Sequence, residues 1–514
     1  MSKIEPETPA VTIETEVIAI VDDASLSDRQ RIRMLVPLII SNLEKRGKFY
    51  TSRQKRYYFS SLDKEVFYIK SDDFIWYISH FTGLNQLDSL LAKNIKWIDT
   101  YIRVLSKKKD IDIEFKVFSH FDKLKNELYI HNNKSIVFIT KNKVKVVENG
   151  FNDVIFRNTK NEPWELLENV DDSVDYLRSL IRSVSFSDSM LPMEDIYLVF
   201  EYYVYSLFLP ELFESKVILN IIWDMWSWKS FILSMLYKIF YWERKKLSTM
   251  PSKDDWLEVF LANNSLVFLD NVELKWTTLK SKIDIICAAA TWVAANKRML
   301  FTDGDEFTQD LSTNIGFSAI QPEYNRRDLS ERSLVFFLNK RPTYSSGQVS
   351  QSQYIENRDI IMTMICHKFM EILQNIEVYD DYESSFRMAD FSNFLFNNFE
   401  NEQERMVSIF EKLTMIQQTF TSSNDLLLIL LEDIFDSGEK VLNAKGFYSA
   451  NELNKIFSLY SSRRENKNIK YPYNARTLWR ALNDNIDSYK NSASINIAMH
   501  MKWWNQRVYS ISRI

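Results

Sequence analysis

The chain has 514 residues, of which 46% are hydrophobic and 26% are charged, and its formal net charge is −5. This length predicts several domains of ordinary size, and this composition predicts a globular protein with sizeable cores. The nearly neutral charge excludes a basic field over the whole molecule, so any contact with nucleic acid must use a local patch.

Features that would place the chain in a membrane are absent from its sequence. It contains no signal peptide, no lipidation motif and no apolar run of the roughly 20 residues that a membrane span needs. Its only cysteines, Cys287 and Cys366, lie in apolar helical stretches and are expected to be reduced core thiols. We therefore expect a cytoplasmic protein with no membrane partner.

The first two hundred residues predict a tail followed by a domain of mixed structure. Residues 1–27 are acidic and lack helical periodicity, which predicts a mobile tail. Residues 28–200 are expected to form an α+β domain. Within it, "KRYYFSS" and "EVFYIKS" predict a hairpin, and "NELYIHNNKSIVFITKNKVKVVENG" alternates apolar and polar residues as a β-meander does.

Residues 201–345 alternate apolar strands with helices, which predicts an α/β nucleotide-binding domain. An expected strand at 217–222 and an expected helix at 231–240 enclose "WDMWSWKS", which ends in Lys229 and Ser230. This layout matches the phosphate-binding P-loop G-x-x-x-x-G-K-[ST], except that Trp223 and Trp228 occupy the two glycine positions. The nucleotide-binding residues predicted from this match are Trp223, Asp224, Met225, Trp226, Ser227, Trp228, Lys229, Ser230 and Phe231.

Two anomalies of composition bear on this loop. The chain has 8 glycines, about 1.6% of its residues where about 7% is usual, and it has 13 tryptophans. Some bacterial lineages read the codon UGA as glycine, whereas a common alternative translation table reads it as tryptophan. We hypothesise that many of these tryptophans stand for glycine. The alternative is a genuine, tryptophan-bearing chain with a decayed P-loop.

Whether these loop residues are tryptophan or glycine decides whether the loop can bind phosphate. A P-loop wraps phosphate with successive backbone N–H groups, which requires φ > 0 and close approach of the backbone. Tryptophan resists that conformation and its indole fills the phosphate's space. As written, the loop should not bind ATP tightly; with glycine at 223, 226 and 228 it becomes an unambiguous P-loop.

Further glycine-like positions are Trp503 and Trp504, which fall at an expected hairpin turn. Other tryptophans are compatible with ordinary core positions; these are Trp76, Trp97, Trp242, Trp256, Trp276 and Trp479.

Two later motifs complete the predicted ATPase site. In "NNSLVFLDN" a short apolar strand ends at Asp270, where a carboxylate would hold Mg²⁺ together with the hydroxyl of Ser230. The next residue is Asn271 rather than a glutamate, so the catalytic base stays open between Asp270 and Glu273. In "EYNRRDLSERSLVFFL" a helix flanked by arginines leads into a strand. Arg327 or Arg332 could act as an arginine finger, in the same chain or across a subunit boundary; the alternative is a solvated basic turn.

The stretch "NNSLVFLDN…IDIICAAATWVAANKRMLFTDGDEF…RRDLSERSLVFFL" resembles the ATP-binding proteins of prophages and integrative elements, whose core is related to AAA+ and superfamily 3 primase-helicases. The family carries A-T-G where this chain has Ala290-Thr291-Trp292, and R-P-D-L-x-x-R-S near Arg332. Its sensor asparagine falls near Ser318, and Asn314 is the nearest asparagine. "RMADF", residues 387–391, matches the family's helical part. The resemblance covers most of the chain and is sharpest from 217 to 338.

The C-terminal third predicts a helical region at 346–430 and a winged-helix domain at 431–514. "YSANELNKIFSLYS" predicts a helix capped by Ser449, "NARTLWRALNDNID" predicts a second helix, and "INIAMHMKWWNQRVYSI" predicts a hairpin. Basic residues gather on the second helix and the wing, which favours DNA over a protein partner. The candidate DNA-binding residues are Arg476, Arg480 and Arg507.

These features predict an α/β multidomain protein with an AAA+-like P-loop core, using ATP and Mg²⁺, in which Lys229, Asp270, Arg327 and Arg332 carry catalysis. The resemblance implies a hexamer-like homo-oligomeric ring that acts on DNA during replication of a phage or mobile element. One alternative is a catalytically dead DNA-binding scaffold or regulator, and another is an ATP-driven loader that does not unwind duplex. The N-terminal block offers no carboxylate constellation typical of a primase.

Overall fold

The structure is a computed structural model, and it describes most of the chain between residues 13 and 513. For some of these residues only the backbone is described. The described ranges are 13–52, 55–84, 93–100, 113–157, 161–170, 175–188, 191–222, 229–241, 245–272, 280–291, 294–298, 306–310, 313–319, 327–339, 347–377, 381–422, 426–436, 442, 446–463, 478, 482, 495–502 and 506–513.

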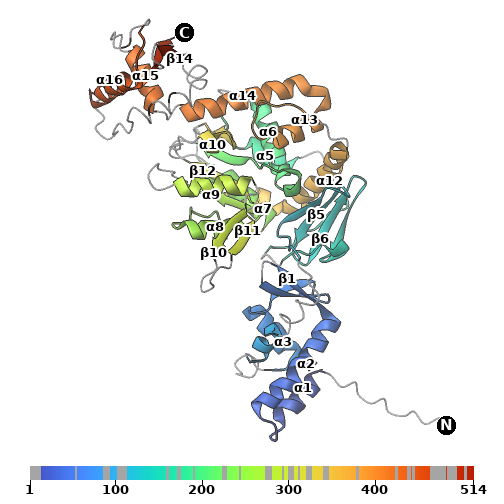
Figure 1. The fold of residues 1–514 in the computed structure, drawn as a ribbon. Coiled ribbons are helices and arrows are strands. Elements are labelled where there is room, and N and C mark those ends of the chain that lie inside the picture. Colours follow the sequence, from blue (N-terminus) through green and yellow to red (C-terminus); the bar gives the residue numbers. More distant parts are fainter. Residues whose placement is uncertain are drawn as a thin grey trace, which may run out of the picture. The chain divides into compact units, whose positions relative to one another are not determined.

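The chain divides into two compact units, residues 1–166 and 167–514. The first unit begins with helices packed on a small antiparallel sheet of order β1-β2-β3 (Figure 1). Its elements are α1 (Ile13–Asp22), α2 (Asp28–Arg46), β1 (Gly47–Ser52), β2 (Lys55–Ser60), β3 (Glu65–Tyr68) and α3 (Asp72–Thr82). Gly47 joins α2 to β1 where a Cβ would lie 2.0 Å from the Phe59 carbonyl oxygen, so only glycine fits this junction.

Helix α1 corrects one expectation. The segment 1–27 was predicted to be a mobile tail, but residues 13–22 are helical and Val17 is only 1% exposed within the core formed by α2 and α3. The acidic residues Glu14 and Glu16 obscure the apolar face that Ile13, Val17 and Ile20 present to that core. Residues 1–12 lie outside the described part.

The rest of the first unit is an antiparallel meander of order β4-β5-β6-β7. Its strands are β4 (Ser119–Asp122), β5 (Glu127–Asn132), β6 (Ser135–Thr140) and β7 (Lys143–Glu148), followed by the short 3-10 helix η1 (Phe151–Asp153). The predicted hairpin β2–β3 and the predicted meander are both confirmed. Asn149 connects the two sheets, because its amide donates to the carbonyls of Lys64 at 3.0 Å and Phe156 at 2.9 Å.

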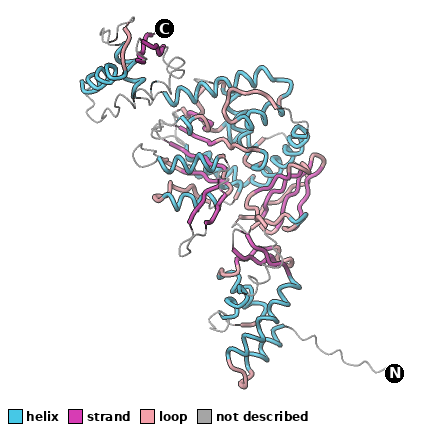
Figure 2. The backbone as a smooth tube through the Cα atoms, viewed as in Figure 1, coloured by secondary structure: helices cyan, strands magenta, loops and turns pink. Residues whose placement is uncertain are grey.

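The second unit contains a parallel sheet of order β13-β8-β12-β9 (Figure 2). Its strands are β8 (Ile218–Ile222), β9 (Leu266–Leu269), β12 (Asn314–Ala319) and β13 (Ser333–Phe337). All residues of β8, β9 and β12 are buried, as expected for parallel strands covered on both faces. The mixed α/β class is thus confirmed, with the predicted strands before the P-loop segment and before Asp270 in place.

Helices cover this sheet and extend the unit. Helix α7 (Lys229–Phe240) contacts β12 and β9, and α14 (Gln403–Ser422) contacts β13. The other elements up to the end of the helical region are α5 (Tyr176–Arg182), α6 (Met193–Ser206), η2 (Pro210–Leu212), α8 (Asp254–Ala262), α9 (Lys280–Ala290), β10 (Ala294–Arg298), β11 (Glu306–Asp310), α10 (Arg327–Ser330), α11 (Gly347–Glu356), α12 (Arg358–Glu377), α13 (Ala389–Asn398), η3 (Glu400–Glu402) and α15 (Leu426–Asp436).

The N-terminal domain therefore ends earlier than expected. Its predicted boundary near residue 200 moves to 166, because helices α5 and α6 belong to the second unit. Phe186 and Phe200 pack on Phe336 of β13, with ring centroids 5.6 and 5.4 Å away. Residues 176–206 thus cover the β13 edge of the parallel sheet. The further divisions near 345 and 430 stay predictions.

The last part of the chain has a small core of its own. Helix α16 (Ala450–Arg463) begins with a capping box in which the Ser449 hydroxyl and Glu452 carboxylate bind each other and the opposite backbone amides. Strands β14 (Ile495–Lys502) and β15 (Gln506–Arg513) form the predicted hairpin. Leu478 and Leu482 of the predicted second helix are fully buried against these elements.

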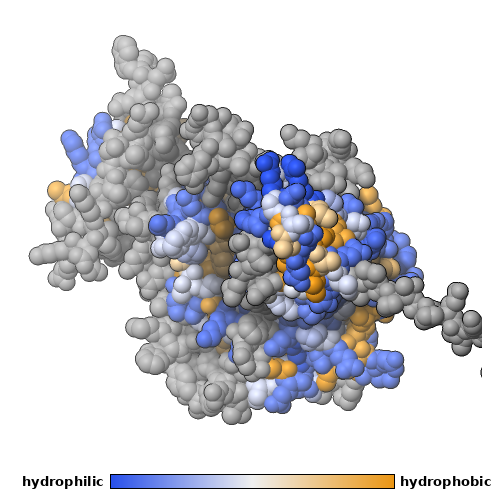
Figure 3. All heavy atoms as spheres, turned by 90° about the horizontal axis from the view of Figure 1, so that it is seen from below, coloured by the Kyte–Doolittle hydropathy of each residue, from blue (hydrophilic) through white to orange (hydrophobic). Residues whose placement is uncertain are grey.

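No helix within the described ranges is long and apolar enough to cross a bilayer. On the face shown in Figure 3, hydrophilic residues occupy more of the described surface than hydrophobic ones. Both cysteines are buried and unpaired with each other, and burial raises the pKa of the Cys366 thiol, so this thiol stays protonated and inert, as predicted for core cysteines.

Several residues with a left-handed backbone conformation are not glycine, which is relevant to the low glycine content of the chain. Among the described residues, Gly83 and Gly150 have positive φ, and so do four asparagines, one lysine and one aspartate. Asparagine tolerates this region better than other non-glycine residues. No described tryptophan has positive φ. Trp76, Trp97 and Trp256 are 55%, 56% and 60% exposed, so core positions are ruled out for these three.

Candidate functional site

The carboxyl ends of the parallel strands bring the predicted site residues to one edge of the sheet. Strand β12 lies between β8 and β9, and its register aligns Ala319 with Ile222 and Phe317 with Leu269. The P-loop segment leaves after Ile222, Asp270 follows β9, and Ser318 is the last residue but one of β12. Ligands of parallel α/β sheets bind at this edge.

Asp270 forms the centre of a hydrogen-bonded cluster at this edge. Ser230, in the first turn of α7, donates its hydroxyl to Oδ1 of Asp270. Ser318 donates to the same Oδ1 at 2.7 Å and accepts the backbone N–H of Asn271 at 3.2 Å. The Asn271 side chain donates to Oδ2 at 3.3 Å. The carboxylate is therefore held by hydroxyls from α7 and β12 although each group comes from a different part of the sequence.

The backbone around Asp270 is fixed as well. Its N–H donates to the Ser248 carbonyl at 2.9 Å, and Ser248 N–H donates to Phe268 at 3.2 Å, so this segment pairs alongside β9. Asn271 then turns the chain sharply with φ 51°, and Val272 N–H donates to the Ser318 carbonyl at 2.8 Å. These bonds leave little freedom for the carboxylate, as a metal ligand requires.

Ser230 and Asp270 together fit a magnesium ion that is shared with phosphate. Mg²⁺ takes oxygen ligands and is bound by one or two protein groups together with substrate phosphates. A hydroxyl and a carboxylate in direct contact, at the first turn of the 12-residue helix α7, supply such oxygens beside an anion-binding helix N-terminus. The described residues contain no cluster of three His, Cys, Asp or Glu that would hold a metal without phosphate.

Several predicted nucleotide-binding residues are not described. Residues 223–228 lie outside the described ranges, as does Glu273, and only the backbone of Lys229 is described, as the first residue of α7. The Phe231 side chain is 8% exposed, so only its backbone could face a nucleotide. Their roles stay predictions.

From the sequence alone, the sensor position falls near Ser318, but the nearest asparagine is Asn314. The structure puts Ser318, not Asn314, against Asp270. Asn314 lies at the opposite end of β12, where its buried amide donates to the Leu207 carbonyl at 3.3 Å. The predicted sensor position near Ser318 is thus at the site, while the nearest asparagine is excluded by strand length. A serine at the tip of an apolar strand gave the only sequence signal.

The two candidate finger arginines lie at the other end of the sheet. The Arg332 carbonyl accepts the N–H of Ile218, the first residue of β8, at 2.8 Å. Because five residues of β8 separate this point from the P-loop segment, it lies roughly 13 Å from the Asp270 edge. The Arg332 Nη1 donates to the Asp328 carbonyl at 2.7 Å, which holds the guanidinium at the amino end. A contact with the nucleotide of the same chain is therefore excluded for Arg332 in this arrangement.

Arg327 differs from Arg332 in exposure. Its side chain is 64% exposed, and its Nε donates to Glu331. The second oxygen of Glu331 accepts a hydrogen bond from Arg387, in the segment "RMADF". Arg332 is half-buried instead. Arg327 thus lies at the surface in an ion pair, whereas Arg332 is anchored to the backbone of α10.

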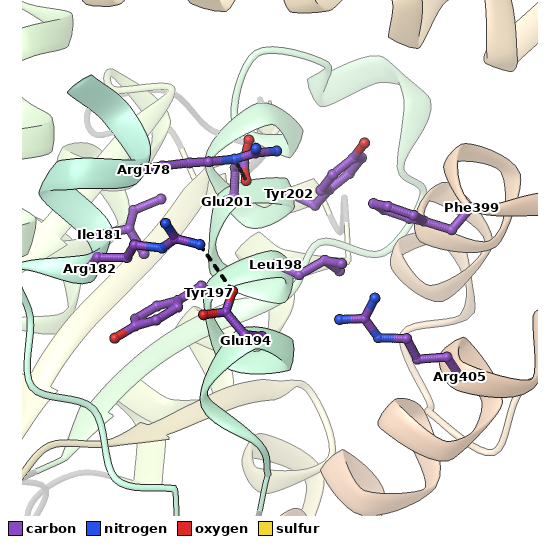
Figure 4. A pocket seen from close by; sticks show the side chains of 10 residues that line it. All are labelled: Arg178, Ile181, Arg182, Glu194, Tyr197, Leu198, Glu201, Tyr202, Phe399 and Arg405. Carbon is purple, nitrogen blue, oxygen red and sulfur yellow. Dashed lines mark hydrogen bonds and ion pairs between the residues drawn. The ribbon is translucent and has the colours of Figure 1, made fainter. Parts of the chain in front are cut away.

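A separate pocket of about 190 Å³ lies between α5, α6 and the start of α14 (Figure 4). Its arginines are each matched by a carboxylate: Arg178 with Glu201 at 2.8 Å, Arg182 with Glu194 at 3.1 Å, and Arg405 with Asp195 at 2.7 Å. Tyr202 and Phe399 pack beside it with centroids 5.0 Å apart. The balanced pairs connect three helices and account for the pocket as structural.

The predicted DNA-binding side chains are not described. Arg476 and Arg480 lie outside the described ranges, and only the backbone of Arg507 is described, within β15. The turns containing Trp292 and Trp503-Trp504 are also outside. DNA binding by this region stays a prediction that the hairpin and the buried leucines allow.

No protein-family profile and no curated protein sequence matches the chain. Among solved structures, it is similar to the apo NrS-1 C-terminal region (residues 305–718 in that protein), with 10% identity, a TM-score of 0.43, and 92% of this chain and 97% of that chain covered. It is also similar to the SCCmec type IV Cch active helicase, with 10% identity, a TM-score of 0.43 and 90% of each chain covered. A JCV helicase gives 17% identity and a TM-score of 0.21, covering 48% of this chain and 64% of that one. Because each TM-score is below 0.5, the functional assignment depends on the geometry of this chain's own residues.

Proposed function

We propose that this protein, with glycine at 223, 226 and 228, is a Mg²⁺-dependent ATPase that couples ATP hydrolysis to work on DNA, as a helicase-like motor of a phage or mobile element. The observation that carries the proposal is the hydroxyl–carboxylate cluster of Ser230, Asp270 and Ser318 at the carboxyl edge of the sheet, beside the start of α7. Each of its members comes from a separate element, which a solvated surface cluster would not require.

Each residue of the site would have its own role. Lys229 would contact the β- and γ-phosphates from the start of α7, and backbone N–H groups of the restored loop would wrap them. Ser230 and Asp270 would hold Mg²⁺, which when bound neutralises charge on the phosphate oxygens. Ser318 would fix the orientation of Asp270. The base that activates water stays open between Asp270 and Glu273.

Completion of the site would require a second copy of the chain. The candidate fingers Arg327 and Arg332 belong to the opposite end of the sheet from Asp270, so a neighbouring subunit would have to supply the arginine. This supports the homo-oligomeric, hexamer-like ring that the family resemblance implies.

The proposal is tested with the protein carrying glycine at 223, 226 and 228. We expect Mg²⁺-dependent ATP turnover that Lys229→Ala abolishes and that chelation of the metal suppresses. The protein as written, with three tryptophans, serves as the matched control and should bind ATP weakly. Sequencing of the encoding gene decides between the two: UGG at codons 223, 226 and 228 would refute the recoding hypothesis.

The second candidate function is a DNA-binding scaffold with a dead nucleotide site. The observation that favours it is the sequence of the loop as written, which has tryptophan at 223, 226 and 228, including both glycine positions of the P-loop pattern. Absence of turnover in the glycine-restored protein, with and without DNA, would establish this alternative. A loader would hydrolyse ATP yet fail to separate strands.

A further inference from the structure

The first compact unit carries an excess of positive charge that the whole chain lacks. Residues 1–166 contain 27 Lys or Arg against 23 Asp or Glu, whereas residues 167–514 contain 37 against 46. The excess peaks at residues 45–56, which include six basic residues and no acidic one. These six are Lys45, Arg46, Lys48, Arg53, Lys55 and Arg56. They follow the end of α2 and the hairpin β1–β2.

The structure separates the cations of this segment that are already engaged from those that face outward. Arg56 pairs with Asp99, and the Arg46 guanidinium lies 5.1 Å from the ring centroid of Phe81. Lys48 and Lys55 are exposed and have no carboxylate partner within the described ranges, and the Lys55 Nζ lies 5.9 Å from the ring centroid of Tyr68. Strand alternation puts both on the same face of the sheet as Tyr50 and Phe59.

A groove of about 440 Å³ opens beside Lys48 on that face. Three aromatic side chains line it: the buried Tyr50 of β1 and Phe59 of β2, and the partly exposed Phe151 of η1. Its far wall is the turn after β7, where Gly150 has φ 94°. A Cβ at that position would lie 3.0 Å from the Phe59 ring, so glycine permits this close approach.

Two lysines, Lys48 and Lys64, and two carboxylates, Glu148 and Asp153, line the groove. Lys64 Nζ pairs with Glu148 at 2.7 Å, and Asp153 lies on the same wall. Burial, and to a lesser degree Asp153, raises the pKa of Tyr50, so its phenol remains neutral. The exposed lysines without an ion-pair partner in the described ranges are Lys48 and Lys55, roughly 13 Å apart along the hairpin.

A ligand that suits both parts must combine flat rings with a chain of negative charges. Single-stranded nucleic acid has this combination, since its bases stack on aromatic side chains while its phosphates follow basic residues. Duplex DNA keeps its bases stacked inside and would leave the aromatic groove unused. An acidic peptide would match the lysines but not the row of rings.

We propose that the groove and the β1–β2 hairpin bind single-stranded nucleic acid, with a base in the groove against Phe151 and the backbone along Lys48 and Lys55. The site lies in a unit that has no role in the proposed ATP chemistry. It would hold a strand independently of nucleotide state.

The test measures binding of a labelled oligo-dT to the full-length chain by fluorescence anisotropy over a salt series, without nucleotide. We expect Lys48→Ala/Lys55→Ala to weaken binding about tenfold and to lower the slope of log affinity against log salt by about 1.4, since each lost phosphate contact removes about 0.7 on a single strand. Phe151→Leu should weaken binding about fivefold or more with the slope unchanged, because stacking of one base contributes about 1–3 kcal/mol.

The matched control is Lys123→Ala/Lys125→Ala, which removes the same charge from the exposed turn between β4 and β5. Equal losses in the control and the Lys48/Lys55 variant would overturn the proposal, as would an unchanged affinity in the latter. An equal effect on a duplex of the same length would reassign the patch to duplex DNA. Thermal unfolding of each variant checks that the fold is retained. No step requires ATP turnover, so an inactive ATPase would leave this result intact.

Discussion

The two ends of the parallel sheet carry opposite chemistry. At the carboxyl end, Asp270 accepts hydrogen bonds from Ser230 and Ser318. At the amino end, α10 carries Arg327 and Arg332, and the Arg332 carbonyl is bonded to the first residue of β8. Hydroxyl and carboxylate oxygens are thus collected at one end, and the two arginines at the other. Because they lie at opposite ends of the sheet, the oxygens around Asp270 and the arginines of α10 cannot reach the same nucleotide within one chain. This separation favours an active site formed between two subunits.

The largest expected effect comes from removing the proposed arginine finger at the amino end. Arg332→Ala in the glycine-restored protein should lower kcat by about 10³- to 10⁵-fold while nucleotide affinity changes little, because a finger acts on charge that develops in the transition state. Arg327→Ala, measured in parallel, identifies which of the two is the finger. Steady-state ATPase and nucleotide-binding titrations give the two quantities.

Subunit mixing then tests whether the ends meet across a boundary. Combining wild-type and Lys229→Ala protein should depress activity more steeply than the fraction of wild type falls. Activity strictly proportional to that fraction would show that the subunits act as independent monomers. The separation of Asp270 from the arginines would then have no role in catalysis between subunits. An equal loss of binding and turnover in Arg332→Ala would indicate a folding defect.

The next effect concerns the carboxyl end. Ser318→Ala should lower ATP turnover by about ten- to 100-fold, because a hydrogen bond to a charged group contributes about 1.5–3 kcal/mol. Asn314→Ala, at the other end of the same strand, is the matched control and should affect stability rather than Mg²⁺ dependence. If Ser318→Ala has the metal dependence and kcat of the parent, the carboxylate does not need this support.

Gly316 lies in β12 between the two ends, and its substitution tests the side-chain packing of the sheet. A Cβ there would lie 2.8 Å from the Phe268 ring of β9. We expect Gly316→Ala to destabilise the second unit by about 1–3 kcal/mol, the range for overpacking. Adding Phe268→Leu should restore part of that loss in a double-mutant cycle followed by chemical denaturation. Additive losses would show that the two side chains do not compete for space.

The smallest expected effect concerns DNA binding by the C-terminal region. Replacing Arg476 and Arg480 by alanine in the full chain should weaken duplex binding by about 1 kcal/mol or more per lost contact, with a lower salt dependence. Arg507→Ala should act in the same direction. Electrophoretic mobility shifts at low salt are the measurement, and the Lys48→Ala/Lys55→Ala protein is the control for single-strand binding. Unchanged affinity for duplex would assign this region to protein contact.

Local patterns in the sequence determined the elements around the site. The apolar run before residue 223, the amphipathic run after Ser230 and the run ending at Asp270 predict β8, α7 and β9, and all three are present. The hairpin β2–β3, the meander and the Ser449 cap are likewise local, because each depends on side chains that are near one another in sequence. Such features can be predicted from periodicity and turn chemistry.

The tertiary structure alone decided which of these residues meet. Strand order put β12 between β8 and β9, and this brought Ser318 to Asp270 across 48 residues of sequence while it moved Asn314 to the far end. Because β13 runs parallel to β8, α10, which precedes β13, places its arginines at the amino end of the sheet, away from Asp270. Burial of Val17 in the core likewise explains why helix α1 forms within the segment that was predicted to be an acidic tail. Strand order and burial depend on contacts between distant segments, and no local pattern encodes those contacts.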